Sequence, residues 1–252
     1  MKSTLILALL SVSSLGACID QQDTPSDDVS VDPRLATNSM LPSVISPTAI
    51  YAAPLTGVAL ANSGLEASAG GRSYLSYIID CALQTGQSVT SNYQLSHYTY
   101  PGNIGIAPAW TTRALTLQEM RYISSCVLAR ANYFGQAVTI SMRADAAGFA
   151  TTPDEAANYN VEEGAFYGNI FATLGHQLHA CNGVDQVRDG DTYGDLPLRQ
   201  CAQEDPNNLG YTLCGFVFDG NCADVCVVNG DHYTTCNSQT EVITSRLYGT
   251  AP

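Results

Sequence analysis

The nine cysteines constrain this chain more than any other feature of its sequence. Nine cysteines in 252 residues are too many for an ordinary protein of a reducing compartment, and they favour an exported chain cross-linked by disulfides. Six of them crowd the last third of the chain: Cys181, Cys201, Cys214, Cys222, Cys226 and Cys236. Because glycine and asparagine punctuate that stretch, the sequence predicts a loop-rich region over residues 181–252 that disulfides hold together.

The N-terminal segment predicts export. Residues 4–15 are apolar but too few to span a bilayer, which takes about 20 apolar residues, so they indicate a signal peptide. They end in a motif of small residues before a cysteine, Leu15-Gly16-Ala17-Cys18. This motif resembles the lipobox of bacterial lipoprotein precursors. The resemblance implies that residues 1–17 are removed as a signal peptide and that Cys18 is lipidated.

The resemblance to a lipoprotein also implies a location. Several acyl chains on Cys18 bury enough methylene groups for stable anchoring. We therefore expect an exported protein held by lipid at the bacterial cell envelope, with the membrane as its partner. The residue after Cys18 is Ile19. Since an aspartate at that position favours retention at the inner membrane, its absence favours the outer membrane.

The charge balance excludes one class of partner. The chain has 23 acidic and 10 basic residues, which gives a formal net charge of −13. Binding to nucleic acid depends on a basic patch that contacts phosphates. We therefore expect no nucleic-acid partner.

Composition divides the mature chain into three parts. Residues 18–48 are acidic, contain prolines and show no helical or strand period, which predicts a lipidated, disordered tether. Residues 49–180 contain the periodic apolar stretches and predict an α/β core. The cysteine-rich region over 181–252 completes the chain.

Two amphipathic helices are predicted in the core, over residues 72–84 and 117–134. The second begins at a capping box, in which the side chains of Thr116 and Glu119 each bond the amide of the other residue. Stretches rich in strand-forming residues are found at 87–100 and 136–143. Helices mixed with strands, followed by the loop-rich disulfide-stapled region, predict an α+β fold.

One disulfide pairing follows from the predicted helices. With Cys18 lipidated, eight cysteines remain, and this even number is what a disulfide framework requires. Eight cysteines allow 105 connectivities. Cys81 and Cys126 each lie on the apolar face of a predicted helix, so we expect them to pair. The closed loop of about 45 residues would stabilise the fold by roughly 4 kcal/mol.

Three further stretches carry a second resemblance, at residues 126–135, 162–169 and 214–216. Through them the mature chain resembles uncharacterised cysteine-rich lipoproteins of soil bacteria. No activity that we know of is assigned to those proteins. The resemblance therefore implies a lipid-anchored protein and transfers no function.

Two clusters have a spacing that suits a metal. His176 and His179 come shortly before Cys181, and zinc or copper accepts such ligands. The second cluster resembles a zinc ligand set, Cys222-x3-Cys226-x5-His232-x3-Cys236. An exported cysteine is usually oxidised, so disulfides are favoured in both clusters. A metal held by His176 and His179 stays as the alternative.

An acidic stretch resembles the start of a calcium-binding loop. Asp189 and Asp191 occupy the first and third positions of an EF-hand pattern, and Asp195 lies close by. Gln200 stands where the pattern requires a bidentate glutamate. We therefore expect an acidic turn and no cofactor, with calcium as the alternative.

Two acidic pairs are candidates for hydrolytic chemistry. Glycoside hydrolysis needs two carboxyl groups about 5–10 Å apart, and Asp154–Glu155 and Glu162–Glu163 offer such groups. No Gly-x-Ser-x-Gly motif of a serine hydrolase occurs. The favoured hypothesis is a lipid-anchored binding or structural module with an unidentified protein or carbohydrate ligand. The alternatives are an exported, carbohydrate-active hydrolase and a surface protein that binds calcium or another metal.

Overall fold

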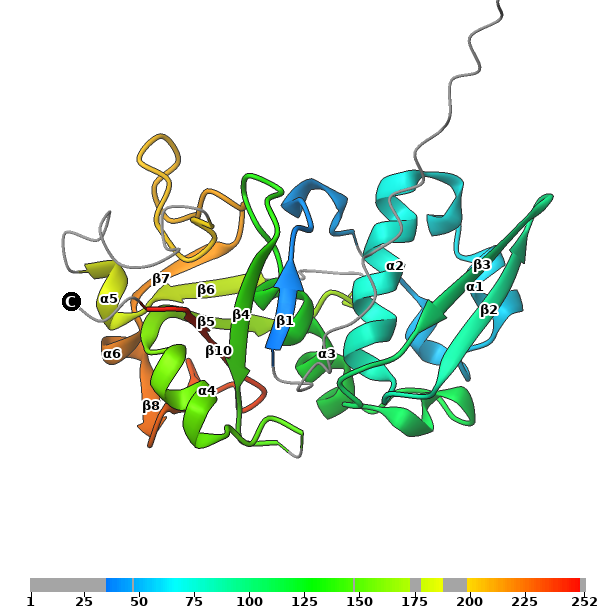
Figure 1. Cartoon of the computed structure of the whole chain (residues 1–252). Helices are drawn as coiled ribbons and strands as arrows, with labels where there is room; N and C mark the ends of the chain where they lie inside the picture. The colour runs from blue at the N-terminus through cyan, green and yellow to red at the C-terminus, as the bar shows by residue number, and fades with distance from the viewer. Residues whose placement is uncertain (1–34, 47, 147, 173–177, 188–198, 250–252) are drawn as a thin grey trace, which may run out of the picture. The chain divides into compact units, whose positions relative to one another are not determined.

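The computed structural model describes residues 35–46, 48–146, 148–172, 178–187 and 199–249 (Figure 1). Its main sheet has six strands, in the order β1-β4-β10-β5-β6-β7. The strands are β1 (Leu35–Asn38), β4 (Val138–Arg143), β5 (Val161–Gly168), β6 (Leu178–Asn182), β7 (Val217–Asn221) and β10 (Ile243–Leu247). Neighbouring strands are antiparallel, except that β6 and β7 are parallel.

Helices and two small hairpins accompany this sheet. The α-helices are α1 (Gly57–Asn62), α2 (Ala69–Ala82), α3 (Leu117–Ala129), α4 (Pro153–Asn158), α5 (Val184–Val187) and α6 (Cys222–Val225). Short 3-10 helices are η1 (Pro42–Val44), η2 (Ile50–Ala52), η3 (Leu65–Ala67) and η4 (Pro108–Thr111). The hairpins pair β2 (Ser88–Tyr93) with β3 (Ser96–Pro101) and β8 (Cys226–Asn229) with β9 (His232–Cys236). The predicted α+β fold class is confirmed.

Local signals position the two long helices. The predicted capping box is present at the start of α3, where the Thr116 side chain accepts from the Glu119 amide and Glu119 accepts from the Thr116 amide. The helix ends at Ala129, short of the predicted residue 134, because the Asn132 side chain accepts from the Phe134 amide and donates to the Gln136 carbonyl. These bonds turn the chain away from the helix axis towards β4.

The core lies between the helices and the sheet. Helix α3 packs on β5 and β10, and α2 packs on α3. Trp110 is fully buried, and its ring lies nearly perpendicular to that of Phe171, with centroids 6.3 Å apart. The Cys81–Cys126 disulfide joins α2 to α3, as the helix faces predicted, and both sulfurs belong to fully buried residues.

Two predicted boundaries do not match the observed elements. Strand β1 pairs with β4, and Met40 is buried, so part of the predicted tether over 18–48 belongs to the fold. The predicted boundary between residues 180 and 181 falls inside β6, and β10 lies between β4 and β5 in the sheet. Composition missed both features because it carries no information on which distant strands pair.

The predicted lipidation site Cys18 and the predicted signal peptide lie outside the described residues. Within the described ranges, no helix combines the length and the apolar character that crossing a membrane requires.

Candidate functional site

Disulfides account for all eight cysteines of the predicted framework. The structure pairs Cys81 with Cys126, Cys181 with Cys222, Cys201 with Cys214 and Cys226 with Cys236. The zinc-like cluster of the sequence is therefore divided between two disulfides. Its histidine, His232, lies beside Asp231, with Nδ1 3.0 Å from a carboxylate oxygen.

The predicted metal ligands are only partly visible. His176, Asp189, Asp191 and Asp195 lie outside the described residues. His179 is described, on β6. Among the described residues, the group whose ligand atoms lie close enough to hold a metal consists of the disulfide sulfurs of Cys181, Cys222 and Cys226.

The acidic pairs proposed for glycoside hydrolysis have structural partners instead. Glu163 is fully buried and accepts from Arg199 at 2.7 Å. Glu162 accepts from Arg246 at 2.7 Å and from the Tyr233 hydroxyl at 2.7 Å. The partners of the two glutamates lie in different places, because Arg199 also donates to a carbonyl at the end of α3, whereas Arg246 belongs to β10 and Tyr233 to β9. The two carboxyl groups do not face a common substrate position.

The other pair is divided too. Glu155 is buried and accepts from the Ser141 hydroxyl at 2.7 Å, whereas Asp154 is exposed. The expected pairing of carboxylates for hydrolysis is therefore corrected at both places.

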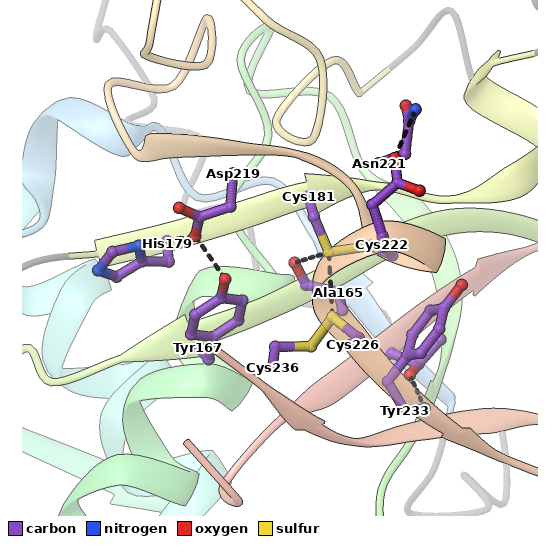
Figure 2. The surroundings of a disulfide bond; sticks show 12 residues. Ala165, Tyr167, His179, Cys181, Asp219, Asn221, Cys222, Cys226, Tyr233 and Cys236 are labelled. Carbon is purple, nitrogen blue, oxygen red and sulfur yellow. Dashed lines mark hydrogen bonds and ion pairs between the residues drawn. A yellow bond between two sulfur atoms is a disulfide. The ribbon is translucent and has the colours of Figure 1, made fainter. Parts of the chain in front are cut away.

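A different cluster forms where β5, β6 and β7 lie side by side (Figure 2). Tyr167 on β5 is directly opposite His179 on β6, and their rings stack with centroids 5.1 Å apart and planes 5° from parallel. Asp219 on β7 lies 2.7 Å from His179 Nδ1, measured to Oδ2. The Tyr167 hydroxyl donates to the same oxygen, and Asn237 donates to that hydroxyl at 3.0 Å.

The protonation states follow from this geometry. Burial alone would raise the pKa of Asp219, but hydrogen bonds from His179 and Tyr167 lower it below the ordinary aspartate value. Burial, followed by the contact with Asp219, raises the pKa of Tyr167. Asp219 is therefore ionised and accepts a hydrogen bond from Nδ1–H of His179. Nε2 is then the nitrogen of this ring that can act on a ligand.

A pocket of about 340 Å³ adjoins the cluster. Its lining consists of Arg121, Tyr167, His179, Asn237, Ser238 and Gln239. Arg121 comes from α3 and lies 3.5 Å from Glu241, with 38% of its side chain exposed. The pocket therefore presents a cation, an imidazole held by a carboxylate and a serine hydroxyl.

Asn237 and Ser238, which line the pocket, have positive φ angles. Their φ values are 46° and 71°, in the left-handed region that few residues other than glycine adopt. The two residues form a tight turn between Cys236 and Gln239, whose backbones exchange hydrogen bonds of 2.9 and 2.8 Å, and a two-residue turn of this kind requires positive φ at both positions. The Cys226–Cys236 disulfide precedes this turn, and the Asn237 amide donates to the Val225 carbonyl at 3.1 Å.

Sequence reasoning found His179 and missed its neighbours. Tyr167, Asp219 and Asn237 are distant in sequence from His179 and from one another. The order and register of β5, β6 and β7 bring Tyr167 and Asp219 to His179, and Asn237 reaches Tyr167 from the turn after β9. Asp219 precedes Gly220 and Asn221, a composition that indicates a turn, although the three residues end strand β7.

Comparisons with known protein families, with curated protein sequences and with solved structures find no match to this chain.

Proposed function

We propose that this protein is an exported, lipid-anchored binding module of the bacterial cell envelope, and that its ligand site is the pocket between Arg121 and His179. The lipobox-like motif that ends at Cys18 supports the anchor. The pocket supports the binding role, because the guanidinium side chain of Arg121 and the oriented imidazole of His179 both line it.

The side chains of the pocket define the class of ligand. Arginine presents a planar fork of donors that matches a carboxylate. His179, fixed by Asp219, adds a donor when both of its ring nitrogens are protonated. The chain as a whole carries a net charge of −13, so long-range attraction does not favour anions. Recognition then rests on these local groups, and we propose a small ligand that carries a carboxylate.

The experiment compares two probes of nearly the same shape, acetate and acetamide, titrated into the 15N-labelled mature chain. Cys18→Ser removes the lipid for this purpose. We expect acetate to produce saturable shifts at Arg121 and His179, with acetamide producing none. Arg121→Gln should abolish the shifts, and the matched control Arg113→Gln should keep them, because Arg113 pairs with Glu119 outside the pocket. Equal responses to the two probes would refute the carboxylate site.

The anchor has its own test. In a bacterial host supplied with labelled palmitate, the wild-type chain should incorporate label and sediment with membranes. The Cys18→Ser chain should incorporate none. A wild-type chain that is exported without label would contradict the anchor and leave the pocket proposal standing.

One observation favours a second function, an exported hydrolase. His179 has the arrangement of a general base, with Asp219 holding Nδ1, and Ser238 lines the same pocket. A fluorophosphonate probe labels serines that are activated in this way. Labelling of Ser238 that is lost in His179→Ala would support the hydrolase. An unlabelled wild-type chain would discard it.

A further inference from the structure

Two disulfides of the C-terminal region lie in direct contact. Cys181–Cys222 joins β6 to α6, and Cys226–Cys236 joins the two strands of the β8–β9 hairpin. The Sγ atoms of Cys181 and Cys226 are 3.6 Å apart, although they belong to different disulfides (Figure 2). The Sγ atoms of Cys181, Cys222 and Cys226 all lie within 4.8 Å of one another.

The four cysteine residues differ in exposure. Cys181, Cys222 and Cys236 are fully buried, whereas Cys226 is half-buried. Cys226 also begins the exposed strand β8, in which Val227 and Val228 are 62% and 63% exposed. Of the four cysteines, Cys226 is therefore the one most open to a reductant from solution, whereas both residues of the Cys181–Cys222 bond are fully buried.

We propose that these four cysteines form a thiol–disulfide exchange site, in which Cys226 passes reduction from the exposed disulfide to the buried one. Exchange proceeds when a thiolate attacks a disulfide sulfur, so its rate depends on access and on which sulfur is near. The contact between Cys181 and Cys226 places the attacking sulfur next to the disulfide that it attacks. The partner of this site is a dithiol reductant of the exported compartment.

The steps balance as follows. One thiolate of the dithiol attacks Cys226 Sγ, which forms a mixed disulfide and releases Cys236 as a thiolate. The second thiolate of the dithiol resolves the mixed disulfide. The dithiol is thereby oxidised to a disulfide. Its two electrons reduce the Cys226–Cys236 bond, so that both cysteines become thiols.

The second stage needs no further reductant. Deprotonated Cys226 turns to Cys181, attacks its Sγ and breaks the Cys181–Cys222 bond. A Cys181–Cys226 bond forms, and Cys222 leaves as a thiolate that takes up the proton lost by Cys226. The number of disulfides and electrons is unchanged in this stage. Strand β6 is then tied to the hairpin in place of α6.

The test uses Cys236→Ser in the full chain, exported to an oxidising compartment. This variant leaves Cys226 without its disulfide partner. Free thiols are alkylated at acid pH, and the linkages are mapped by mass spectrometry. We expect a Cys181–Cys226 cross-linked peptide and a shift of the alkyl label from Cys226 to Cys222.

The matched control is Cys214→Ser, which leaves Cys201 free in a bridge that does not contact the cluster. There we expect the label on Cys201 alone. Label confined to Cys226 in Cys236→Ser, with Cys181–Cys222 intact, would overturn the proposal. Equal exchange of disulfide partners in both variants would overturn it as well, because the contact between Cys181 and Cys226 would then give no preference for exchange at this site.

A second measurement covers poor folding of Cys236→Ser. The oxidised wild-type chain is treated with limiting dithiothreitol, quenched and mapped over time. The Cys181–Cys226 peptide should appear while Cys81–Cys126 is still intact. Loss of all four native disulfides in parallel, without that peptide, would contradict the exchange site.

Discussion

The helical side of the molecule and the C-terminal side of the sheet reach stability by different means. The large buried cluster around α2 and α3 contains large apolar side chains, among them Trp110, Tyr74 and Ile123, and its many members include the cysteines of two disulfides, Cys81–Cys126 and Cys201–Cys214. Among the described residues, the smaller cluster next to β8 and β9 has seven buried members, and three of them are cysteines. The members are Ala165, Tyr167, Cys181, Cys222, Tyr233, Cys236 and Val242.

This difference shows what disulfides replace. A small cluster buries too little apolar surface to offset the entropy of ordering its loops. Disulfides lower the conformational entropy of the unfolded chain, so less entropy is lost when the loops become ordered. The C-terminal side is therefore expected to depend on its disulfides for local order, whereas the helical side is expected to keep its packing when Cys81–Cys126 is removed, at a cost in overall stability.

The largest effect is expected where the two sides are joined. Arg199 is fully buried, pairs with Glu163 on β5 and donates to the Ala129 carbonyl at the end of α3. Glu163→Gln leaves the guanidinium charge buried without its partner and should lower the free energy of unfolding by about 3–5 kcal/mol. Urea denaturation measures this loss. The control Arg113→Gln breaks an exposed pair and should leave stability nearly unchanged, and similar losses in both variants would contradict the account.

The second prediction compares two disulfides whose loops are nearly equal. Cys81–Cys126 and Cys181–Cys222 span 45 and 41 residues, so loop entropy assigns about 4 kcal/mol to each. Replacing either pair by alanine should cost about that much. Hydrogen exchange should separate them, because only the loss of Cys181–Cys222 should expose the amides of β7 to β9. Equal protection in both variants would remove the contrast between the two sides.

A smaller effect is expected at Asp219. Asp219→Asn removes the charge that holds His179 and Tyr167 and should cost about 2 kcal/mol at neutral pH. The pKa of Asp219 is lowered in the folded state. Its contribution is therefore present above the ordinary aspartate pKa and is lost as the pH falls through the folded value. The stability difference between the two proteins should shrink on acidification, and a difference that grows would contradict the ionised dyad.

The smallest effect is expected at the start of α3. Thr116→Ala removes the side chain that accepts from the Glu119 amide and should cost about 1 kcal/mol. Thermal unfolding followed by circular dichroism measures it. Thr152→Ala, at the start of the shorter helix α4, is the matched comparison. A loss at Thr152 that exceeds the loss at Thr116 would show that the helical side depends less on α3 than its packing indicates.

The features that sequence predicted are those set by neighbouring residues. The capping box needs only Thr116 and Glu119, and the pairing of Cys81 with Cys126 needed only the apolar faces of two helices. Strand β1 was missed because its pairing with β4 depends on residues about 100 positions away. In the His179 cluster, sequence pointed to His179 and missed Asp219 for the same reason, since Asp219 reaches His179 through the parallel pairing of β6 with β7.

The most direct test is a disulfide map of the mature chain exported to an oxidising compartment, with intact mass and free thiols measured on the same sample. We predict no free thiol apart from an unlipidated Cys18, a mass lower by the eight hydrogens of four disulfides, and the pairs Cys81–Cys126, Cys181–Cys222, Cys201–Cys214 and Cys226–Cys236. Free thiols at Cys181, Cys222, Cys226 and Cys236 with stoichiometric zinc would contradict the account, because that region would then be a metal centre.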